Sequence, residues 1–326
     1  MEQYAPILIL PAALLLDLAL GEPPGCCHPV CHFGRWARLM ERTWKRLLGK
    51  TFLAGSLAAL CAVLPPVCLG AGIVLLAAAL LPSWAAWCAA ALVVYLCMAP
   101  RSLAAHARRV LSAARENDLP QAKRQVSMIV GRDTQTLDMP GVLRAAIESV
   151  SENLTDGILS TLFWATIGLL LDGPAGCAAA AILHRCFNTL DALWGKKNDE
   201  YRRFGTFSAR TDDALNYLPA RLSLPLIALS CLPIPGMRSR RSLSIGWKYR
   251  SAHASPNSAW SEAAFAEALG LKLGGPVAYK GIPAPYPYIG EGRMDARPGD
   301  LSRSIVLMYA ATCTATALFT LGTACF

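Results

Sequence analysis

The sequence consists of long apolar runs separated by stretches rich in basic and acidic residues. The longest run covers residues 52–100, which are 49 residues without a charge. As one helix it would extend roughly 73 Å at ~1.5 Å per residue, more than twice the ~30 Å of a bilayer's hydrocarbon core. The run must therefore fold back, and Pro65-Pro66 and Pro82 are the possible breaks. The pattern predicts two membrane helices joined by a turn.

Further apolar segments predict more membrane-embedded structure. Residues 305–326 are 22 uncharged residues, which is long enough to cross a bilayer. Residues 4–16 are apolar but short, and without a basic start or a cleavage site they predict an uncleaved anchor. Residues 157–171 and 222–237 are marginal in length, and three prolines in the second suggest a broken or re-entrant element. We expect an all-α, polytopic integral membrane protein with four to six membrane helices, some short or re-entrant.

The basic residues lie between the apolar segments, at residues 35–50, 101–144, 185–210 and 238–250. The positive-inside rule places all of these stretches in the cytoplasm. That arrangement requires residues 154–183 and 222–237 to return to the side on which they start. We therefore expect one membrane-embedded domain over residues 1–326 in the cell (inner) membrane. Its cytoplasmic insertions would cover about 101–153, 185–216 and 238–303, with the catalytic face toward the cytoplasm.

Composition supports membrane embedding and limits the classes of binding partner that we expect. Mean hydropathy is +0.37 and only 16% of residues are charged, against about 25% in a soluble domain. The net charge of +9 comes without a basic patch interleaved with aromatic residues, so nucleic acid is not an expected partner. The net positive charge is better explained by basic cytoplasmic stretches that set the membrane topology and by anionic substrates than by nucleic acid.

The cysteines predict neither a disulfide framework nor a firm metal site. The chain has 12 of them, most standing singly in apolar runs, where cysteine behaves as a small hydrophobic residue. The stretch CCHPVCH at residues 26–32 could hold zinc. No second pair stands at zinc-ribbon spacing, however, so local loop structure is the favoured interpretation.

Three carboxylates precede the uncharged residues 157–171. Glu148, Glu152 and Asp156 recur every four residues, so on an α-helix they stack along one face, with Ser149 and Asn153 on the neighbouring face. A solvated acidic helix end is the plain explanation. A cation or hydrogen-bond donors between the three carboxylates would offset their mutual repulsion. Carboxylate oxygens are ligands that suit Mg²⁺. Ionisable groups beside a membrane segment favour a functional site.

A second polar stretch follows at residues 184–222. His184, Asn188 and Asp191 share one helical face, and several lysines and arginines surround Asp199, Asp212 and Asp213. Mixed charge of this density is typical of a solvated loop, but its place between apolar segments makes a surface that binds phosphate or carboxylate plausible.

Two insertions also show helical signals. Residues 101–134 have helical spacing with charged faces, broken at residues 117–120. In residues 255–276, Ser258 or Ser261 can cap a helix that ends at Gly270, with Glu262 and Glu267 facing outward.

Together these stretches resemble the CobD/CbiB family of adenosylcobinamide-phosphate synthases. The matching pieces are LDLALGEPP, HPV with FGR, RSLAAHARRV, VGRDTQTLD, ESVSENLTDGI, NTLDALWGKKNDEY, FGTFSARTDDALNYLPARL, SPNSAWSEAAFAEALGLKLGGP and IGEG. They follow the family's order over nearly the whole chain, which makes the resemblance specific.

The resemblance implies a ligase of cobalamin biosynthesis. Such an enzyme uses ATP and Mg²⁺ to join the corrinoid adenosylcobyric acid to (R)-1-amino-2-propanol or its O-phosphate. It works at the lipid bilayer, and other cobalamin-assembly enzymes are its candidate partners. ATP can activate the carboxylate as an acyl phosphate, which needs cations on the phosphates, and the amine needs a base.

On this basis we expect three groups of site residues. The expected catalytic residues are Glu148, Glu152, Asp156, Asp191, Asp212 and Asp213, of which Glu152 and Asp156 would also hold Mg²⁺. The residues expected to bind substrate and phosphate are Arg132, Asp133, Asn153, Asn188, Lys196, Arg210, Asn216, Arg221, Asn257 and Glu262.

Two other classes of protein fit parts of the pattern. Intramembrane acids and proline-broken helices also describe a small transporter or permease, although no inverted repeat is visible. A non-catalytic membrane scaffold for later pathway enzymes is the other alternative.

Overall fold

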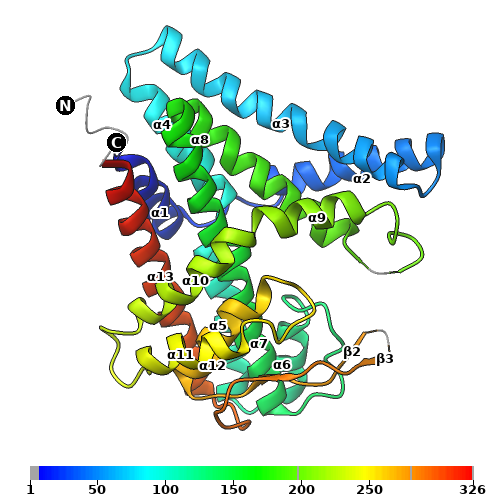
Figure 1. Ribbon diagram of the computed structural model, residues 1–326, viewed down its shortest axis with the longest axis vertical. Helices are drawn as coiled ribbons and strands as arrows, with labels where there is room; N and C mark the ends of the chain where they lie inside the picture. The colour runs from blue at the N-terminus through cyan, green and yellow to red at the C-terminus, as the bar shows by residue number, and fades with distance from the viewer. Residues whose placement is uncertain (1–6, 197, 280, 325–326) are drawn as a thin grey trace. The chain divides into compact units, whose positions relative to one another are not determined.

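A computed structural model of the protein describes residues 7–196, 198–279 and 281–324. The described chain is almost entirely helical and contains two short two-stranded antiparallel sheets (Figure 1). Four helical stretches are long and apolar enough to cross a membrane: Phe52–Leu80, Trp84–Arg115, Met139–Trp194 and Pro298–Ala324. The protein is thus a mostly helical polytopic membrane protein, as the hydropathy pattern predicts. The first residues of the predicted segment 4–16 and the last two of 305–326 lie outside the described residues.

The chain divides into two compact units. The first comprises residues 1–99, 160–216 and 316–326, and the second comprises residues 100–159 and 217–315. The helices of unit 1 are α1 (Ile9–Leu20), α2 (Pro29–Leu48), α3 (Phe52–Leu80), α4 (Trp84–Cys97), α8 (Ser160–Trp194) and α9 (Thr206–Leu215). The last helix, α13 (Pro298–Ala324), begins in unit 2 and ends in unit 1.

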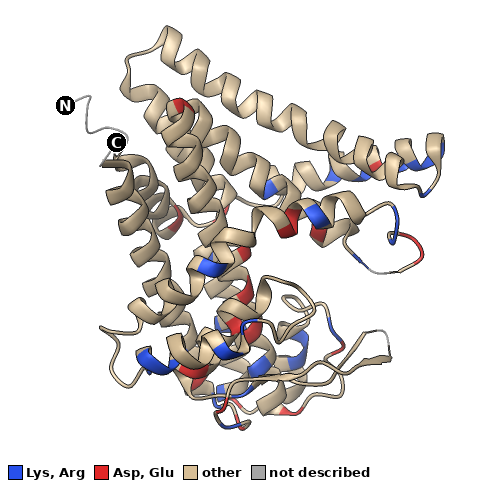
Figure 2. Ribbon diagram, in the orientation of Figure 1, with Lys and Arg blue, Asp and Glu red and all other residues tan. Residues whose placement is uncertain are grey.

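Helices α3 and α4 form the predicted hairpin, and both are free of charged residues (Figure 2). The turn is at Leu81–Ser83, around Pro82, whereas Pro65 and Pro66 lie inside α3. A proline in a membrane helix costs a backbone hydrogen bond, but neighbouring helices and local adjustments can satisfy the freed groups. The side chain of Thr51 caps the start of α3 by accepting from the Ala54 N–H at 3.1 Å.

Helix α8 is a hairpin of two helices. Asp172 and Gly173 have non-helical backbone angles, and Gly173 has a φ of 59° that an L-residue rarely adopts. On either side, Gly168 and Gly176 face each other so closely that a Cβ on either would overlap the backbone of the other. The second arm of α8 therefore runs back along the first. The positive-inside rule requires such a return of residues 154–183, because basic stretches lie on both sides of them.

A hydrophobic core of unit 1 joins α2, α3 and α8 to the loop before α9. Small residues of α3, among them Ala58 and Ala62, pack against Phe187, Trp194 and Phe204. Gly55 is required where α3 meets this loop, because a Cβ there would overlap the Phe204 carbonyl. The loop at residues 195–205 is thereby fixed on the helices.

Unit 2 contains the remaining elements. Its helices are α5 (Pro100–Arg115), α6 (Leu119–Val126), α7 (Met139–Asn153), the π-helical turn η2 (Leu154–Leu159), α10 (Tyr217–Ser230), α11 (Ser239–Tyr249) and α12 (Ser258–Leu269). Its strands are β1 (Leu273–Gly274), β2 (Val277–Tyr279), β3 (Ile282–Ala284) and β4 (Tyr288–Ile289), paired β1 with β4 and β2 with β3. The predicted break at 117–120 is confirmed between α5 and α6, where Asn117 has a φ of 55°.

Helix α12 differs from its predicted environment. It ends at Gly270 in the left-handed conformation, as expected. However, Asn257 precedes the helix and no side-chain cap forms, so the predicted serine cap is wrong. Glu262 and Glu267 are buried, at 4% and 0% exposure, and do not face outward. Every residue of α12 is buried, since α7, α10 and α11 pack around it.

Candidate functional site

The candidate site in unit 2 begins with an ion pair between Arg132 and Glu148. Arg132 follows α6 and donates from Nη2 to Oε2 of Glu148 on α7, and the Gly274 N–H donates to the other oxygen at 2.8 Å. The two side chains are 13% and 12% exposed. Charge-assisted bonds of this kind are strong where water is largely excluded. Both oxygens of Glu148 therefore have partners, and Arg132 is held in place.

Two further acids, Glu152 on α7 and Glu262 on α12, belong to the site. Glu152 lies one helical turn after Glu148. Glu152 accepts a hydrogen bond from the Ser258 hydroxyl at 3.0 Å. Glu262 stands one turn after Ser258 on α12. Burial raises the pKa of the Glu262 carboxyl well above its ordinary value, and the nearby negative charges of Glu152 and Glu148 raise it further. Glu262 thus holds its proton more tightly than an ordinary glutamate.

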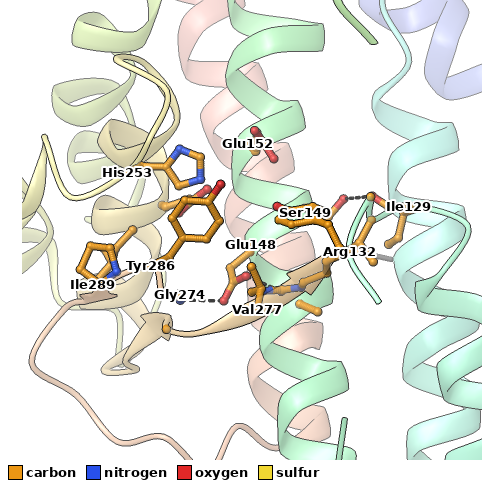
Figure 3. A pocket seen from close by; sticks show the side chains of 17 residues that line it. Ile129, Arg132, Glu148, Ser149, Glu152, His253, Gly274, Val277, Tyr286 and Ile289 are labelled. Atoms are coloured by element: carbon orange, nitrogen blue, oxygen red, sulfur yellow. Dashed lines mark hydrogen bonds and ion pairs between the residues drawn. The ribbon is translucent and has the colours of Figure 1, made fainter. Parts of the chain in front are cut away.

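Both pairs line one pocket, shown in Figure 3. Its volume is about 120 Å³, and its other wall carries His253, Tyr279 and Tyr286. The His253 and Tyr286 rings stack with their centroids 5.6 Å apart. A water occupies about 30 Å³ in the liquid, so the pocket accommodates a small amine or a phosphate group, but not a whole nucleotide.

A second cavity of about 220 Å³ shares Arg132, Glu148 and Gly274 with the first. It adds Arg144, whose guanidinium also donates to the Met294 carbonyl oxygen at 2.6 Å. The second cavity thus combines two arginines with the carboxylates of Asp133 and Glu148. Arg144 was not predicted as a site residue, because only the fold brings it to the same cavity as Arg132.

The predicted face of stacked acids is only partly correct. Glu148 and Glu152 line the pocket, but Asp156 does not, because it lies in η2. There the hydrogen bonds skip five residues rather than four, which displaces the following side chains from the α-helical line. Asp156 is still close enough to act electrostatically on Glu262. Asn153 is exposed and donates to the Ser149 carbonyl oxygen at 2.9 Å.

The other unit 2 residues expected to bind substrate have structural contacts, and Asp133 in addition lines the second cavity. Asp133 accepts from the Gly281 N–H at 2.7 Å and donates its own N–H to the Ala278 carbonyl oxygen, which anchors the β2–β3 hairpin. Arg221 lies over the Tyr217 ring, 3.3 Å from its centroid, and donates to Oδ1 of the buried Asn257 at 3.3 Å. Both Arg221 and Asn257 are thus fixed beside the start of α12.

Unit 1 carries a separate polar cluster between α8 and α9. His184 is fully buried, with Nδ1 3.2 Å from the Thr161 hydroxyl and Nε2 3.1 Å from Oδ1 of Asn216. An amide oxygen only accepts, so Nε2 carries the proton and Nδ1 accepts from Thr161. The predicted shared face of His184, Asn188 and Asp191 is confirmed, since Asn188 and Asp191 interact with Asp212 of α9 and His184 contacts Asn216 directly after that helix.

Asp212 is the centre of this cluster. It is 7% exposed, and burial followed by the negative charge of Asp191 raises the pKa of its carboxyl to about 7. Asn216 and Asn188 oppose that shift through hydrogen bonds. Asp213 is half-buried, whereas Lys196 and Arg210 are exposed. The structure thus brings together Asn188, Asp191, Asp212 and Asn216 and leaves Lys196 and Arg210 at the surface of unit 1.

Glu41, which was not among the predicted site residues, forms a network in unit 1. It accepts hydrogen bonds from Trp194 Nε1 at 3.0 Å and from the Tyr201 hydroxyl at 2.9 Å, and it pairs with Lys45 at 2.7 Å. Lys45 also binds Glu200 at 2.8 Å. The sequence feature that could have indicated this network is the i, i+4 spacing of Glu41 and Lys45, which allows an ion pair on α2. The network anchors the loop that follows Trp194.

Metal binding was tested on the donor sets. Among the described residues, no group of three His, Cys, Asp or Glu side chains is placed to hold a metal ion. Mg²⁺ commonly needs only one or two carboxylates in addition to substrate phosphates. Glu152 lines the pocket and Asp156 does not, so their joint binding of Mg²⁺ stays a prediction.

The histidines of the stretch 26–32 have local partners. His28 caps α2 by accepting from the Val30 N–H at 3.1 Å, and His32 Nε2 lies 2.8 Å from the Cys26 carbonyl oxygen. Those contacts fit the loop interpretation.

The helical spans and the buried polar clusters define a polytopic membrane protein with ionisable groups held beside its spans. The family model described as CobD/Cbib protein matches residues 10–308. The chain therefore belongs to the CobD/CbiB family of cobalamin biosynthesis proteins. No solved structure matches the chain.

Curated relatives align over nearly the full length. Cobalamin biosynthesis protein CbiB of Salmonella choleraesuis is 39% identical over 315 residues, which cover 94% of each chain. Cobalamin biosynthesis protein CobD of Klebsiella pneumoniae is 37% identical, again over 94% of each chain. The CobD protein of Clostridium perfringens is 36% identical over 89% of each chain.

Proposed function

We propose that the protein is an ATP-dependent ligase that joins adenosylcobyric acid to (R)-1-amino-2-propanol or its O-phosphate. Membership of a cobalamin biosynthesis family supports a corrinoid substrate. The observation that carries the chemistry is the buried Glu262 beside Glu152, in a pocket that shares Arg132 with a second cavity where Arg144 also lies. An amine needs carboxylates and a phosphorylated acid needs arginines, and the two adjoining cavities offer both.

The acidic pocket receives the amine. An alkylamine arrives as an ammonium ion at neutral pH, and the Glu152 carboxylate attracts it into the pocket. Glu262 then takes a proton from the nitrogen, because its raised pKa makes it a stronger base than an ordinary carboxylate. Ser258 orients the Glu152 carboxylate through its hydrogen bond.

The second cavity binds the phosphates through its two arginines. An oxygen of the corrinoid propionate attacks the γ-phosphorus of ATP, the bond to the β–γ bridging oxygen breaks, and ADP leaves. The amine nitrogen attacks the resulting acyl phosphate at carbon, the amide C–N bond forms, and inorganic phosphate leaves. Arg132 and Arg144 stabilise the charge on the phosphate oxygens. Bound Mg²⁺, held by Glu152 and Asp156, would neutralise part of that charge.

Purified protein tests the proposal directly. It is incubated with adenosylcobyric acid, ATP, Mg²⁺ and either amine, and both the corrinoid amide and ADP are measured by mass spectrometry. Wild-type protein should form both products in equal amounts. Glu262→Gln should lose at least ~100-fold in rate, since a general base contributes ~10²–10⁴-fold. Glu116→Gln, at the exposed end of α5, is the matched control. Wild-type turnover by the Glu262→Gln protein would sink the proposed base.

The two other classes give different results in the same assay. A transporter would move a corrinoid across a vesicle membrane without forming an amide. A scaffold would form no product alone but would restore it with added pathway enzymes. We further propose that the insertions at about 101–153, 185–216 and 238–303 face the cytoplasm of the cell (inner) membrane. Labelling of a Ser244→Cys protein in intact cells against inverted vesicles tests this placement.

A further inference from the structure

Unit 1 contains a cavity that the proposed reaction does not use. Its volume is about 270 Å³, and residues of α2, α3, α4 and α8 line it. The lining is almost wholly apolar and includes Phe33, Leu69, Ile73, Val93 and Leu96. Its one charged member is Arg185 on α8.

Arg185 has no anionic partner among the residues that the structure describes. Its Nε atom is buried and has no hydrogen-bond partner among these residues. A guanidinium among apolar side chains in a membrane helix is costly and usually marks a place where an anion binds. Arg185 therefore supplies a cationic end to an apolar cavity.

The size and surroundings of the cavity indicate its ligand. Drug-sized ligands occupy about 300–1,000 Å³, so this volume fits a slender chain and excludes a corrin ring. Leu69 and Ile73 line the cavity and are also 65% and 51% exposed. In a membrane-spanning helix such exposed side chains face lipid, so an acyl chain can enter from the bilayer.

The cationic end lies where a headgroup is expected. Cys97, which lines the cavity with Arg185, is the last residue of α4, and Pro29 is the first residue of α2. Helix α2 also carries exposed basic residues, which are Arg35, Arg38, Arg42 and Arg46. A basic amphipathic helix of this type lies in the interface and attracts anionic lipids.

From this arrangement we infer that unit 1 binds one anionic phospholipid, with an acyl chain in the cavity and the phosphate on Arg185. The guanidinium can form paired hydrogen bonds to phosphate oxygens, which the apolar lining does not offer. The inference does not depend on the proposed ligase activity.

Native mass spectrometry of the purified full-length protein tests this site. The protein is exchanged into mixed micelles that contain equal amounts of phosphatidylglycerol and phosphatidylcholine, and the retained lipid is identified. Wild-type protein should keep one phosphatidylglycerol. Arg185→Met should lower the ratio of retained phosphatidylglycerol to phosphatidylcholine by at least ~10-fold, because a hydrogen bond to a charged group is lost. Arg185→Lys should restore most of that preference, and Arg46→Met on α2 should leave it unchanged.

A second variant separates the acyl chain from the headgroup. Val93→Phe fills the apolar part of the cavity and should reduce retention of both lipids, without changing the helical circular dichroism of the protein. If Arg185→Met and Val93→Phe retain phosphatidylglycerol like the wild type, the site does not exist. Equal retention of both lipids by wild-type protein would likewise overturn the anionic preference.

Discussion

The Ser258 hydroxyl donates a hydrogen bond to Oε1 of Glu152 over 3.0 Å and so joins α12 to α7. Ser258 is the first residue of α12, and Glu262 follows it by one turn. The bond fixes one carboxylate of the acidic pocket while the other stays buried beside it. A side chain that looked like a helix cap thus orients a proposed catalytic group.

Ser258→Ala should therefore affect both turnover and folding. Without this bond the Glu152 carboxylate is no longer held in one orientation, so we expect kcat/KM to fall by at least ~10-fold. The thermal transition in detergent should also fall, because loss of a hydrogen bond to a charged group typically costs about 1.5–3 kcal/mol of stability. Ser244→Ala on α11, where the hydroxyl is exposed, is the control and should behave like wild type.

Glu262 predicts a particular pH dependence of the reaction. Its carboxyl has a raised pKa and must be deprotonated to accept a proton from the amine. Activity should therefore fall as pH decreases through the raised pKa, which lies above the ordinary glutamate range. A pH profile of kcat/KM should show this acidic limb in wild-type protein, and Glu262→Gln should lack it. An identical limb in both proteins would assign the titration to another group.

The pair of Arg132 and Glu148 can be tested by a double-mutant cycle on stability. Glu148→Leu leaves a mostly buried guanidinium and the Gly274 N–H without partners. Removing one partner of a buried pair costs about 3 kcal/mol or more. The combined Arg132→Met, Glu148→Leu protein should be more stable than Glu148→Leu alone. Thermal unfolding in detergent measures both, and simple additivity of the two changes would contradict a coupled pair.

Asp212 should make stability depend on pH in unit 1. Its pKa of about 7 exceeds the ordinary aspartate value of 3.8, so the folded state binds more protons than the unfolded state between these values. Stability should consequently decrease as pH rises from about 4 to 7 and level off above, by up to ~4 kcal/mol. Asp212→Asn should flatten this slope. Melting temperatures at several pH values measure it, with Asp199→Asn, an exposed position, as the control.

Gly168 should tolerate no side chain. A Cβ there would overlap the backbone of Gly176 across the α8 hairpin. Overpacking typically costs about 1–3 kcal/mol, so Gly168→Ala should lower the melting temperature clearly. Gly72→Ala in α3, where nothing lies within 4 Å of the added Cβ, should be neutral or slightly stabilising. Equal behaviour of the two proteins would mean that the arms of α8 are not in contact.

Features that depend on nearby residues were predicted well from the sequence. The α3–α4 hairpin follows from a charge-free run too long for one crossing, and the break near Asn117 follows from local backbone preferences. The left-handed Gly270 was equally predictable. Each of these depends on a few neighbouring residues, and the physics of each is local.

Features that depend on distant contacts were not predicted. Glu262 and Glu267 look like the outer face of a helix, and only the packing of three other helices around α12 buries them. The roles of Ser258 and Arg144 likewise depend on contacts with residues more than one hundred positions away. The turn in α8 was expected only as a requirement of topology, since Asp172-Gly173 alone does not specify it.

The π-helical turn η2 has a consequence for variation in chain length. It accommodates one more residue than an α-helical turn would, directly after Glu152 and Asn153. A single-residue deletion there, such as loss of Thr155, would let the helix close into a regular α-helix. Every side chain beyond it would then rotate by roughly 100° relative to Glu152. Variants that lose one residue in this turn should thus be far more damaging than substitutions at the same positions.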